Sequence, residues 1–190
     1  PFIQTKGAQP EIWSLGHRNP QGLSFHPLTK KLWESEFGPR GGDEINIIQP
    51  KLNYGWPVIT YGKEYYGPSI GEGTHKEGMQ QPVRQYSPVI SPSAIHFYTG
   101  SKFPQWKNNL FIATLSSTHL RRLEITDSKI TSEEELLKDK GFRFRNVRGS
   151  PSGDLYVSTD HGLLMKITPK KALIKVAFVG DSLTEGFGCL

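Results

Sequence analysis

The chain has almost no cysteine and no long hydrophobic run, and each absence excludes a class of protein. Its one cysteine, Cys189, is the penultimate of 190 residues, so a framework of internal disulfides is excluded. The apolar run at residues 176–179 (VAFV) is far too short to span a bilayer, so no transmembrane segment is expected. The chain starts at Pro1 and shows no signal peptide, which suggests a truncated or processed start.

Dense basic clusters are also missing, although the formal net charge is +5 and the pI is near 9.3. Lysine and arginine form only local pairs, such as Lys30-Lys31 and Arg121-Arg122. No known nucleic-acid-binding motif accompanies this charge, so nucleic acid is not an expected partner. A basic surface that receives an anionic cofactor is a better use of the same charge.

Turn-forming residues are abundant, with 20 glycines and 14 prolines. Short segments bounded by Gly, Pro, Asn or Ser predict an all-β fold. The predicted strands cover residues 22–25, 31–35, 44–48, 94–98, 109–113, 120–125, 154–158 and 163–167. Residues 131–140 are expected to form a loop or an edge strand with at most one helical turn, which Ser132 could cap.

A weak repeat of a turn followed by a strand favours a β-propeller. Phe111 and Tyr156 are 45 residues apart, which is about one four-stranded blade. Trp33 and Phe111 are 78 residues apart, which fits two blades or one blade with an insertion at residues 61–85. Residues 1–169 are thus expected to form roughly four blades. These blades would make an open arc, because a propeller closes only by contact between its first and last blades.

Three motifs in order carry a specific resemblance: residues 16–22 (GHRNPQG), 36–46 (EFGPRGGDEIN) and 53–57 (NYGWP). Together they closely resemble the soluble aldose sugar dehydrogenases (the glucose/sorbosone dehydrogenase family). That family uses pyrroloquinoline quinone (PQQ) on a six-bladed β-propeller. The resemblance covers residues 1–169 and implies the C-terminal part of such a propeller, with an aldose sugar as substrate and an unidentified electron acceptor. It also implies a periplasmic or secreted location for the intact protein.

The resemblance implies a set of cofactor-binding residues: Arg18, Asn19, Tyr65, Leu115, Arg143, Arg145 and Asp160. PQQ bears three carboxylates, and guanidinium groups suit such an anion because they do not lose their charge. Arg143 and Arg145 alternate in sequence, so period 2 predicts that both point to one face of a strand. Asp160 matches the family's aspartate after the last inner strand, which implies that it orients an arginine or a bound water. The arginines could instead be solvated or paired with Asp or Glu, and Asp160 could simply cap a turn.

Calcium is the second implied ligand of the family. The resemblance assigns the carbonyls of Gly38 and Pro39 to the calcium beside the cofactor, and Glu44 and the Tyr54 carbonyl to a calcium site as well. Calcium prefers six or more oxygen ligands, including carbonyls in tight turns. The alternative is that this Gly-rich segment is a solvated turn.

Several positions depart from the family pattern. Phe37 stands where a histidine is usual, Ser116 where the glucose-specific branch has a lysine, and Asn146 where an aspartate is usual. The family's catalytic base is a histidine on an earlier blade that this chain lacks, and His17 belongs to a block expected to be structural. The chain is therefore expected to be an inactive or incomplete part of the enzyme, with no catalytic residue of its own.

The composition changes class near residue 170. Residues 172–179 form a near-continuous apolar run, as in a buried parallel strand, and residues 176–186 (VAFVGDSLTEG) resemble the first block of a GDSL-type esterase. Residues 170–190 are therefore interpreted as the incomplete start of an α/β-type hydrolase domain. Ser182 would be its vestigial nucleophile, without a base.

Three functions follow from these patterns: a quinone-dependent sugar dehydrogenase, a propeller that binds without catalysis, and an esterase remnant. The dehydrogenase interpretation predicts that Arg18, Arg143, Arg145 and Asp160 line one central cavity. Arginines on opposite faces of a strand would favour the second interpretation.

Overall fold

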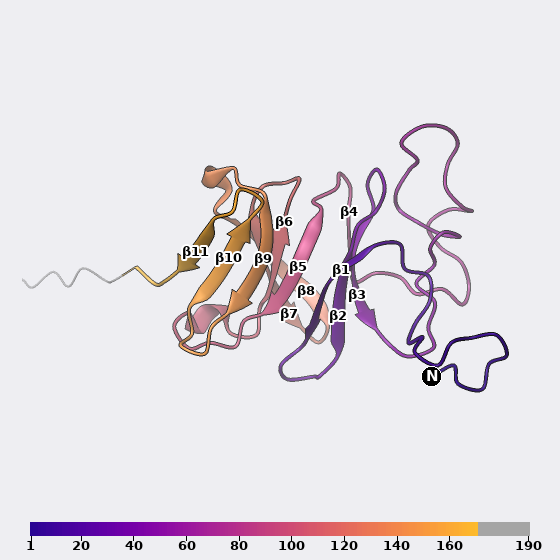
Figure 1. Cartoon of the computed structure of the whole chain (residues 1–190), viewed down its shortest axis with the longest axis horizontal. Helices are drawn as coiled ribbons and strands as arrows, with labels where there is room; N and C mark the ends of the chain where they lie inside the picture. The colour runs from indigo at the N-terminus through magenta and orange to yellow at the C-terminus, as the bar shows by residue number, and fades with distance from the viewer. Residues whose placement is uncertain (171–190) are drawn as a thin grey trace, which may run out of the picture.

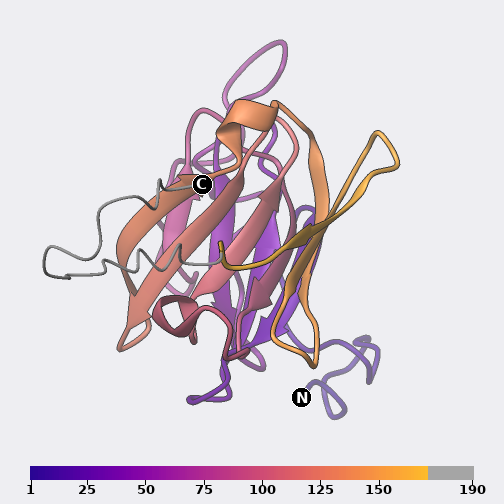
Figure 2. The same ribbon diagram turned by 90° about the vertical axis from the view of Figure 1, so that its left-hand side faces the viewer.

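A computed structural model describes residues 1–170 and contains three antiparallel sheets. The first holds β1 (Pro20–Phe25), β2 (Leu32–Glu36), β3 (Asp43–Ile48) and β4 (Arg84–Tyr86). The second holds β5 (Pro92–Phe97), β6 (Leu110–Thr114), β7 (Leu120–Thr126) and β8 (Lys129–Leu136). The third holds β9 (Phe144–Gly149), β10 (Leu155–Thr159) and β11 (Leu164–Ile167). Figure 1 shows the sheets side by side along the long axis, and Figure 2 views them from the β11 end.

The all-β prediction is confirmed, since each predicted range falls on a strand. Residues 131–140 form the edge strand β8 and the short 3-10 turn η2 (Lys138–Lys140), as expected; the other turn, η1 (Pro104–Trp106), precedes β6. The exposed residues of β8 are mainly charged, which protects an unpaired edge from further strand pairing. Within residues 1–170, no helix is both long and apolar enough to cross a membrane.

The estimate of roughly four blades was wrong, because the described residues form three sheets. Trp33, Phe111 and Tyr156 occupy equivalent places on the second strands β2, β6 and β10, each three residues before the strand's last residue. The spacing of 78 residues is therefore one blade with an insertion. Residues 49–83 form this long irregular connection between β3 and β4, and the count of four blades failed because it assumed blades of regular length.

Two apolar layers hold the sheets together, one on each face of the middle sheet. Ile95 and Ile112 face the first sheet, where they pack with Trp33. Ala94 and Phe111 face the third sheet and pack with core residues such as Phe144 and Val147. Because alternate residues of β5 and β6 point to opposite faces, nearly all of the middle sheet's central residues are buried.

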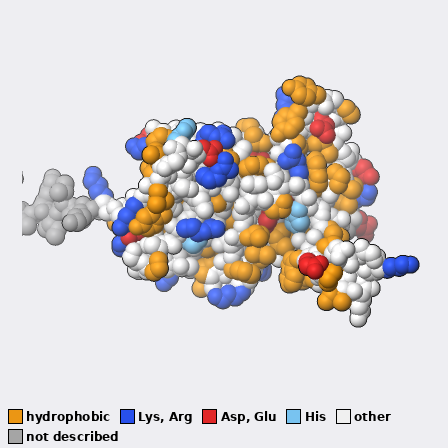
Figure 3. All heavy atoms as spheres, in the orientation of Figure 1, with side chains coloured by type: hydrophobic (Ala, Val, Ile, Leu, Met, Phe, Trp, Pro, Cys, Tyr) orange, Lys and Arg blue, Asp and Glu red, His pale blue; other side chains and the backbone are white. Residues whose placement is uncertain are grey.

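The far face of the first sheet remains partly open. Leu23 and Phe25 of β1 are 56% and 66% exposed, and Trp13 and Leu15 in the N-terminal segment are also exposed. Figure 3 shows hydrophobic side chains at the surface over this end of the molecule. A sheet face that no further sheet covers is what an open arc of blades presents, so the fold is a partial β-propeller.

A buried carboxylate connects the first two sheets. Asp43, 1% exposed at the start of β3, accepts hydrogen bonds from the backbone N–H groups of Gly38 (2.8 Å), Ile90 (2.7 Å) and Ser91 (2.7 Å). Gly38 belongs to the loop after β2, and Ile90 and Ser91 lead into β5. One side chain thus fixes the loop of the first sheet against the first strand of the second.

We predict that Asp43→Asn lowers the free energy of unfolding by about 1–3 kcal/mol. The asparagine keeps the shape, but its NH₂ group faces a backbone N–H that then has no acceptor, and such an orphan costs about 1–3 kcal/mol. Urea denaturation measures the loss. Asp139→Asn, at an exposed site, is the matched control and should stay within about 0.5 kcal/mol of the parent chain. A loss below 1 kcal/mol in Asp43→Asn would contradict the role of this contact.

His96 on β5 makes folding sensitive to acid. Burial, with a smaller effect of nearby Arg148, lowers the pKa of His96 from 6.5 to about 4. The unfolded chain therefore binds more protons between these values, so the stability is complete above pH 6.5 and is lost as pH falls toward 4. We predict that His96→Gln removes about 1–2 kcal/mol of this pH dependence, after allowance for the partial exposure of the ring. The free energy of unfolding of the parent chain and of His96→Gln is measured at pH 7 and at pH 4.5. An equal loss of stability between these two pH values in both proteins would disprove the prediction.

Candidate functional site

A backbone contact repeats at one end of all three sheets. The residue after each second strand donates its N–H to the carbonyl of the residue before the first strand, in the pairs Phe37–Asn19 (3.1 Å), Leu115–Ser91 (3.0 Å) and Asp160–Arg143 (3.0 Å). We call these the rim pairs. The hydroxyl of Ser93, near the start of β5, donates to the carbonyl of Phe144 at the start of β9 (2.8 Å). The N–H of Phe97, at the end of β5, donates to Ser24 near the end of β1 (3.3 Å), so the first strands run in one direction and the rim pairs share one end.

A β-bulge follows each rim pair. The register of pairing skips one residue near the start of each first strand, at Gln21, Ser93 and Arg145. Bulges redirect side chains and are frequent beside functional sites. Four of the residues assigned to the cofactor by resemblance belong to rim pairs (Asn19, Leu115, Arg143 and Asp160), and Arg145 is the third bulge residue. The structure thus gathers them at one end of the arc.

At the third rim pair, two arginines, Arg143 and Arg145, bond to the carboxylate of Asp160. The Nε atoms of Arg143 and Arg145 lie 3.0 Å and 2.7 Å from the two oxygens of Asp160. The hydrogen bonds from Arg145 and then Arg143 hold the pKa of Asp160 below its usual range. Both guanidinium groups are about half exposed, and their Nη atoms make no hydrogen bond with residues 1–170. The trio carries a net positive charge and leaves several N–H donors facing solvent.

Arg18 contacts backbone carbonyls and an aromatic ring, whereas Arg143 and Arg145 contact a carboxylate. Its Nη1 donates to the carbonyls of Phe37 (3.0 Å) and Gly38 (3.2 Å), and its guanidinium lies over the ring of Trp56, 5.3 Å from the centroid. The hydroxyl of Tyr65 donates to the carbonyl of Pro39 (2.7 Å). Arg18 and Tyr65 therefore hold the carbonyls of the loop after β2 in place.

The remaining predicted cofactor residues differ in exposure. Leu115 is buried, only 4% exposed, at the end of β6. The side-chain oxygen of Asn19 accepts a hydrogen bond from Gln21 (2.7 Å), and Asn19 is half-buried. Arg18 lies beside the first sheet, and the small cavity next to it does not include Arg143, Arg145 or Asp160 in its lining. Within residues 1–170, the rims of the first and third sheets are separated by the middle sheet, so the cavity beside Arg18 does not reach the other three residues expected to share it.

A layer of buried carboxylates lies on the far face of the first sheet. Glu34, Glu36 and Glu44 surround the amide nitrogen of Asn46, which lies 3.2–3.3 Å from an oxygen of each. Burial and the neighbouring Glu36 raise the pKa of Glu34 to about 9 and that of Glu44 to about 7. His17 covers this layer, stacked on Tyr54 with ring centroids 4.8 Å apart. The layer carries more potential negative charge than its protein partners neutralise.

Sequence reasoning had singled out Glu44 but missed Glu34 and Glu36. The signal was present, because Glu34 and Glu36 alternate on β2 in the same phase as Glu44 and Asn46 on β3. Paired strands with acidic residues on one buried face are unusual unless a cation is nearby.

Three of the four residues assigned to calcium, Gly38, Glu44 and Tyr54, line one small space, and Pro39 does not. A cavity of about 10 Å³ is lined by Gly38, Glu36, Glu44 and Tyr54, among others, and it can hold one water-sized atom. Carboxylate and carbonyl oxygens are the ligands that calcium prefers. The carbonyls of Gly38 and Pro39 each accept one protein hydrogen bond already, and a carbonyl oxygen has a second lone pair. The donor set therefore fits a calcium ion.

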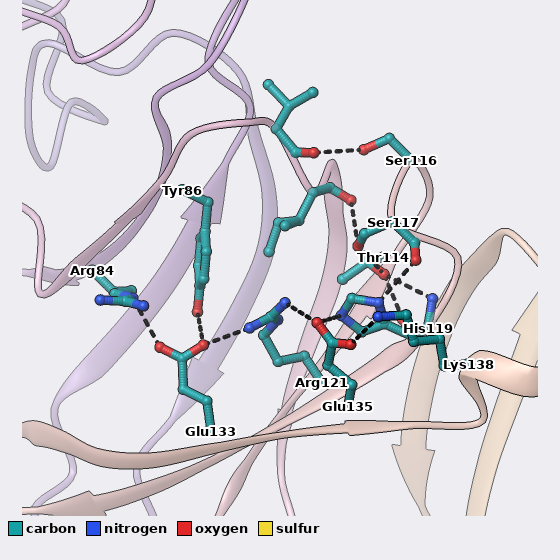
Figure 4. A network of polar contacts seen from close by, with 12 residues as sticks. Arg84, Tyr86, Thr114, Ser116, Ser117, His119, Arg121, Glu133, Glu135 and Lys138 are labelled. Carbon is teal, nitrogen blue, oxygen red and sulfur yellow. Dashed lines mark hydrogen bonds and ion pairs between the residues drawn. The ribbon is translucent and has the colours of Figure 1, made fainter.

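An ion-pair network that the sequence did not predict connects the outer edges of the first two sheets (Figure 4). Glu133 of β8 contacts Arg84 of β4 (2.8 Å) and Arg121 of β7 (2.6 Å), and accepts a hydrogen bond from Tyr86 (3.3 Å). Glu135 extends the network from Arg121, at 2.9 Å. The contacts of Glu133 with Arg84 and Tyr86 join strands distant in sequence, so no local pattern reveals this part of the network.

We predict that Glu133→Gln destabilises the chain by about 1–2 kcal/mol, because the largely buried Glu133 carboxylate is shared by Arg84, Arg121 and Tyr86. The neighbouring Glu134→Gln is the control, since the Glu134 side chain is 46% exposed and Arg122 keeps Glu124 as a partner, so stability should change by less than about 0.5 kcal/mol. Thermal unfolding of both variants in low salt makes the comparison. Equal effects would show that the network adds nothing beyond ordinary surface pairs.

The three sheets, packed through their first strands, define a partial β-propeller with an arginine-bearing rim. The family model "Glucose / Sorbosone dehydrogenase" matches residues 1–166, so the chain belongs to the glucose/sorbosone dehydrogenase family. The family resemblance carried by the three sequence motifs is confirmed.

Individual relatives agree with this assignment. The aldose sugar dehydrogenase YliI of Escherichia coli K12 is 45% identical over 174 residues, covering 90% of this chain and 47% of that protein. The apo crystal structure of the soluble aldose sugar dehydrogenase of Escherichia coli matches with a TM-score of 0.84 and 42% identity, over 89% of this chain and 50% of that one. A PQQ-bound aldose sugar dehydrogenase from Streptomyces coelicolor matches with a TM-score of 0.60 and 29% identity, over 78% and 39%. The chain thus spans at most about half the length of these relatives.

Proposed function

We propose that this chain supplies part of the cofactor-binding rim of a quinone-dependent dehydrogenase that oxidises aldose sugars at C1 to the lactone. The observation that supports this most strongly is the pair of half-exposed arginines held on Asp160 at the rim of the third sheet. A fixed pair of guanidinium groups suits a cofactor that bears several carboxylates. When bound, PQQ supplies the electron acceptor for the sugar.

Each rim residue has a role that its contacts support. Arg143 and Arg145 bind cofactor carboxylates through their solvent-facing Nη atoms, while Asp160 fixes the orientation of both groups. Leu115 and Asn19 line the rim on the neighbouring sheets. Tyr65 combines a partly exposed ring with a hydroxyl fixed on Pro39, so the ring can contact the cofactor.

Calcium belongs to the same proposal. The carbonyls of Gly38 and Pro39 would hold the ion next to the cofactor, with Arg18 and Tyr65 fixing these carbonyls. Glu44 and the carbonyl of Tyr54 would contribute to a calcium site beside the small cavity. A bound cation would keep Glu44 ionised, although burial raises its pKa to about 7.

The remaining parts of the proposal concern the intact protein. Its substrate is an aldose sugar, its reduced cofactor passes electrons to a further acceptor, and it works in the periplasm or outside the cell. No histidine of this chain stands in a motif that resembles the family's catalytic base. We therefore propose that the chain alone binds the cofactor but turns over little or no sugar.

We predict that the combined change Arg143→Ala with Arg145→Ala weakens PQQ binding by about tenfold or more, since it removes charge-assisted hydrogen bonds worth at least 1.5 kcal/mol. Titration of the chain with PQQ in the presence of calcium, followed by absorbance, measures the affinity. Arg122→Ala is the matched control, because Arg122 on β7 is already paired with Glu124 of the same strand and Glu134 of β8 and is not a rim residue. Absence of PQQ binding by the folded parent chain would favour the alternative function, a propeller that binds without catalysis.

Activity is tested separately by adding PQQ, calcium and an aldose and following reduction of an artificial dye. We expect almost no turnover. A rate near that of a complete aldose sugar dehydrogenase would contradict the proposal that the base is missing.

The esterase interpretation concerns residues outside the described part of the chain. Ser182 and the GDSL-like block at residues 176–186 lie beyond residue 170, so they remain a sequence prediction. Labelling by a fluorophosphonate probe tests it, and labelling that survives Ser182→Ala would rule out Ser182 as a nucleophile.

A further inference from the structure

We propose that the buried layer on the far face of the first sheet binds one first-row divalent metal ion through His17, Glu34 and Glu36. One ligand atom from each of these residues lies within 4.8 Å of the other two. The set combines an imidazole with two carboxylates, which suits zinc or a similar ion better than calcium. The site does not include Glu44 or Tyr54 and does not depend on the quinone.

Unpartnered buried atoms provide the independent support. Glu34 is 2% exposed, and its Oε1 has no hydrogen-bond partner within residues 1–170. The Nδ1 atom of His17 is likewise buried and without a hydrogen-bond partner there. A buried polar atom without a hydrogen-bond partner is costly, so the carboxylate oxygen of Glu34 and the ring nitrogen of His17, close together in one cluster, indicate a missing positive group.

The orientation of His17 points to a metal ligand. Its Nε2 lies 2.8 Å from the hydroxyl of Ser14, and its Nδ1 lies 3.5 Å from Oε1 of Glu36. When Nε2 donates its proton to Ser14, Nδ1 carries a lone pair directed at a carboxylate, and these two groups repel unless a cation lies between them. Fixing the ring through the other nitrogen is the usual arrangement for a metal-binding histidine.

The distances fit such an ion. Two ligands of a tetrahedral zinc ion, each about 2.1 Å from the metal, are about 3.4 Å apart, close to the separation between His17 and Glu36. The ligand atoms of His17, Glu34 and Glu36 all lie within 4.8 Å of one another. Side-chain movements of roughly 1 Å or less would bring all three into contact with one ion. Three protein ligands leave a fourth position for water.

A cavity provides the route from solvent. A space of about 220 Å³ between the N-terminal segment and the first sheet is lined mainly by apolar residues, including Trp13, Leu23 and Leu32. His17 and Glu34 are the two titratable residues in its lining. An ion that enters this apolar space therefore meets two of the three proposed ligands, His17 and Glu34, and no competing charge; Glu36 lies behind them, outside the lining.

The experiment is a calorimetric titration of the untagged, chelator-treated chain with Zn²⁺. We expect saturable binding of one ion, with the affinity reduced about tenfold or more in Glu34→Gln. Glu44→Gln is the matched control, because it removes a neighbouring buried carboxylate outside the proposed ligand set and should retain zinc binding. Ca²⁺ at equal concentration should not displace the zinc.

Two results would overturn the proposal: no saturable zinc binding, or equal affinity in the parent chain and Glu34→Gln. Either would mean that a proton on His17 or Glu34 supplies the missing charge. If circular dichroism shows that Glu34→Gln is unfolded, the test uses Ser14→Ala instead. This variant keeps all three ligands but removes the hydroxyl that fixes the His17 ring. Loss of the orienting partner should weaken zinc binding by about tenfold, and an unchanged affinity would contradict the proposal.

Discussion

The contact between Asp43 and three backbone N–H groups is the constraint on which the arrangement of the site depends. A propeller rim is useful only if the loops of successive sheets keep a fixed relation, and the apolar layers between sheets do not specify such a relation closely. Asp43 does, because its two oxygens join the loop after β2 to the segment that enters β5. Burial raises the pKa of Asp43, while the three N–H donors favour its ionised form. The ionised carboxylate of Asp43 is thus stabilised mainly by three backbone N–H groups and not by a counter-ion alone.

The rim pairs show how one backbone plan supports different chemistry. Asn19–Phe37, Ser91–Leu115 and Arg143–Asp160 share the same hydrogen bond and are followed by the same bulge. Their side chains differ completely: a polar and an aromatic pair, a small polar and an aliphatic pair, and a charged pair. The repeated backbone contact therefore fixes where the rim residues lie, and their side chains determine what each rim can bind. Most of the predicted cofactor residues belong to a rim pair or to the bulge that follows it.

The strands and the family were predictable from the sequence, and the tertiary polar contacts were not. Strands such as β6 and β7 are bounded by turn residues, so local pattern reveals them. β4 is only three residues long and lies after a long insertion, which also caused the error in the number of blades. The sequence indicated that Arg143 and Arg145 share a face and that Asp160 orients an arginine, but the sharing of this one carboxylate by both arginines depends on the turn after β10. Glu34 and Glu36 could have been found from their alternation on β2, but the position of His17 over them could not, because His17 comes from a different segment.

A crystal structure of the chain with PQQ and calcium would test the central claim most directly, namely that the arginine-bearing rim receives the cofactor. The account predicts cofactor carboxylates within hydrogen-bond distance of Arg143 and Arg145, with both guanidinium groups still held by Asp160. A cofactor bound elsewhere, with the contacts between the arginines and Asp160 unchanged and facing solvent, would contradict it.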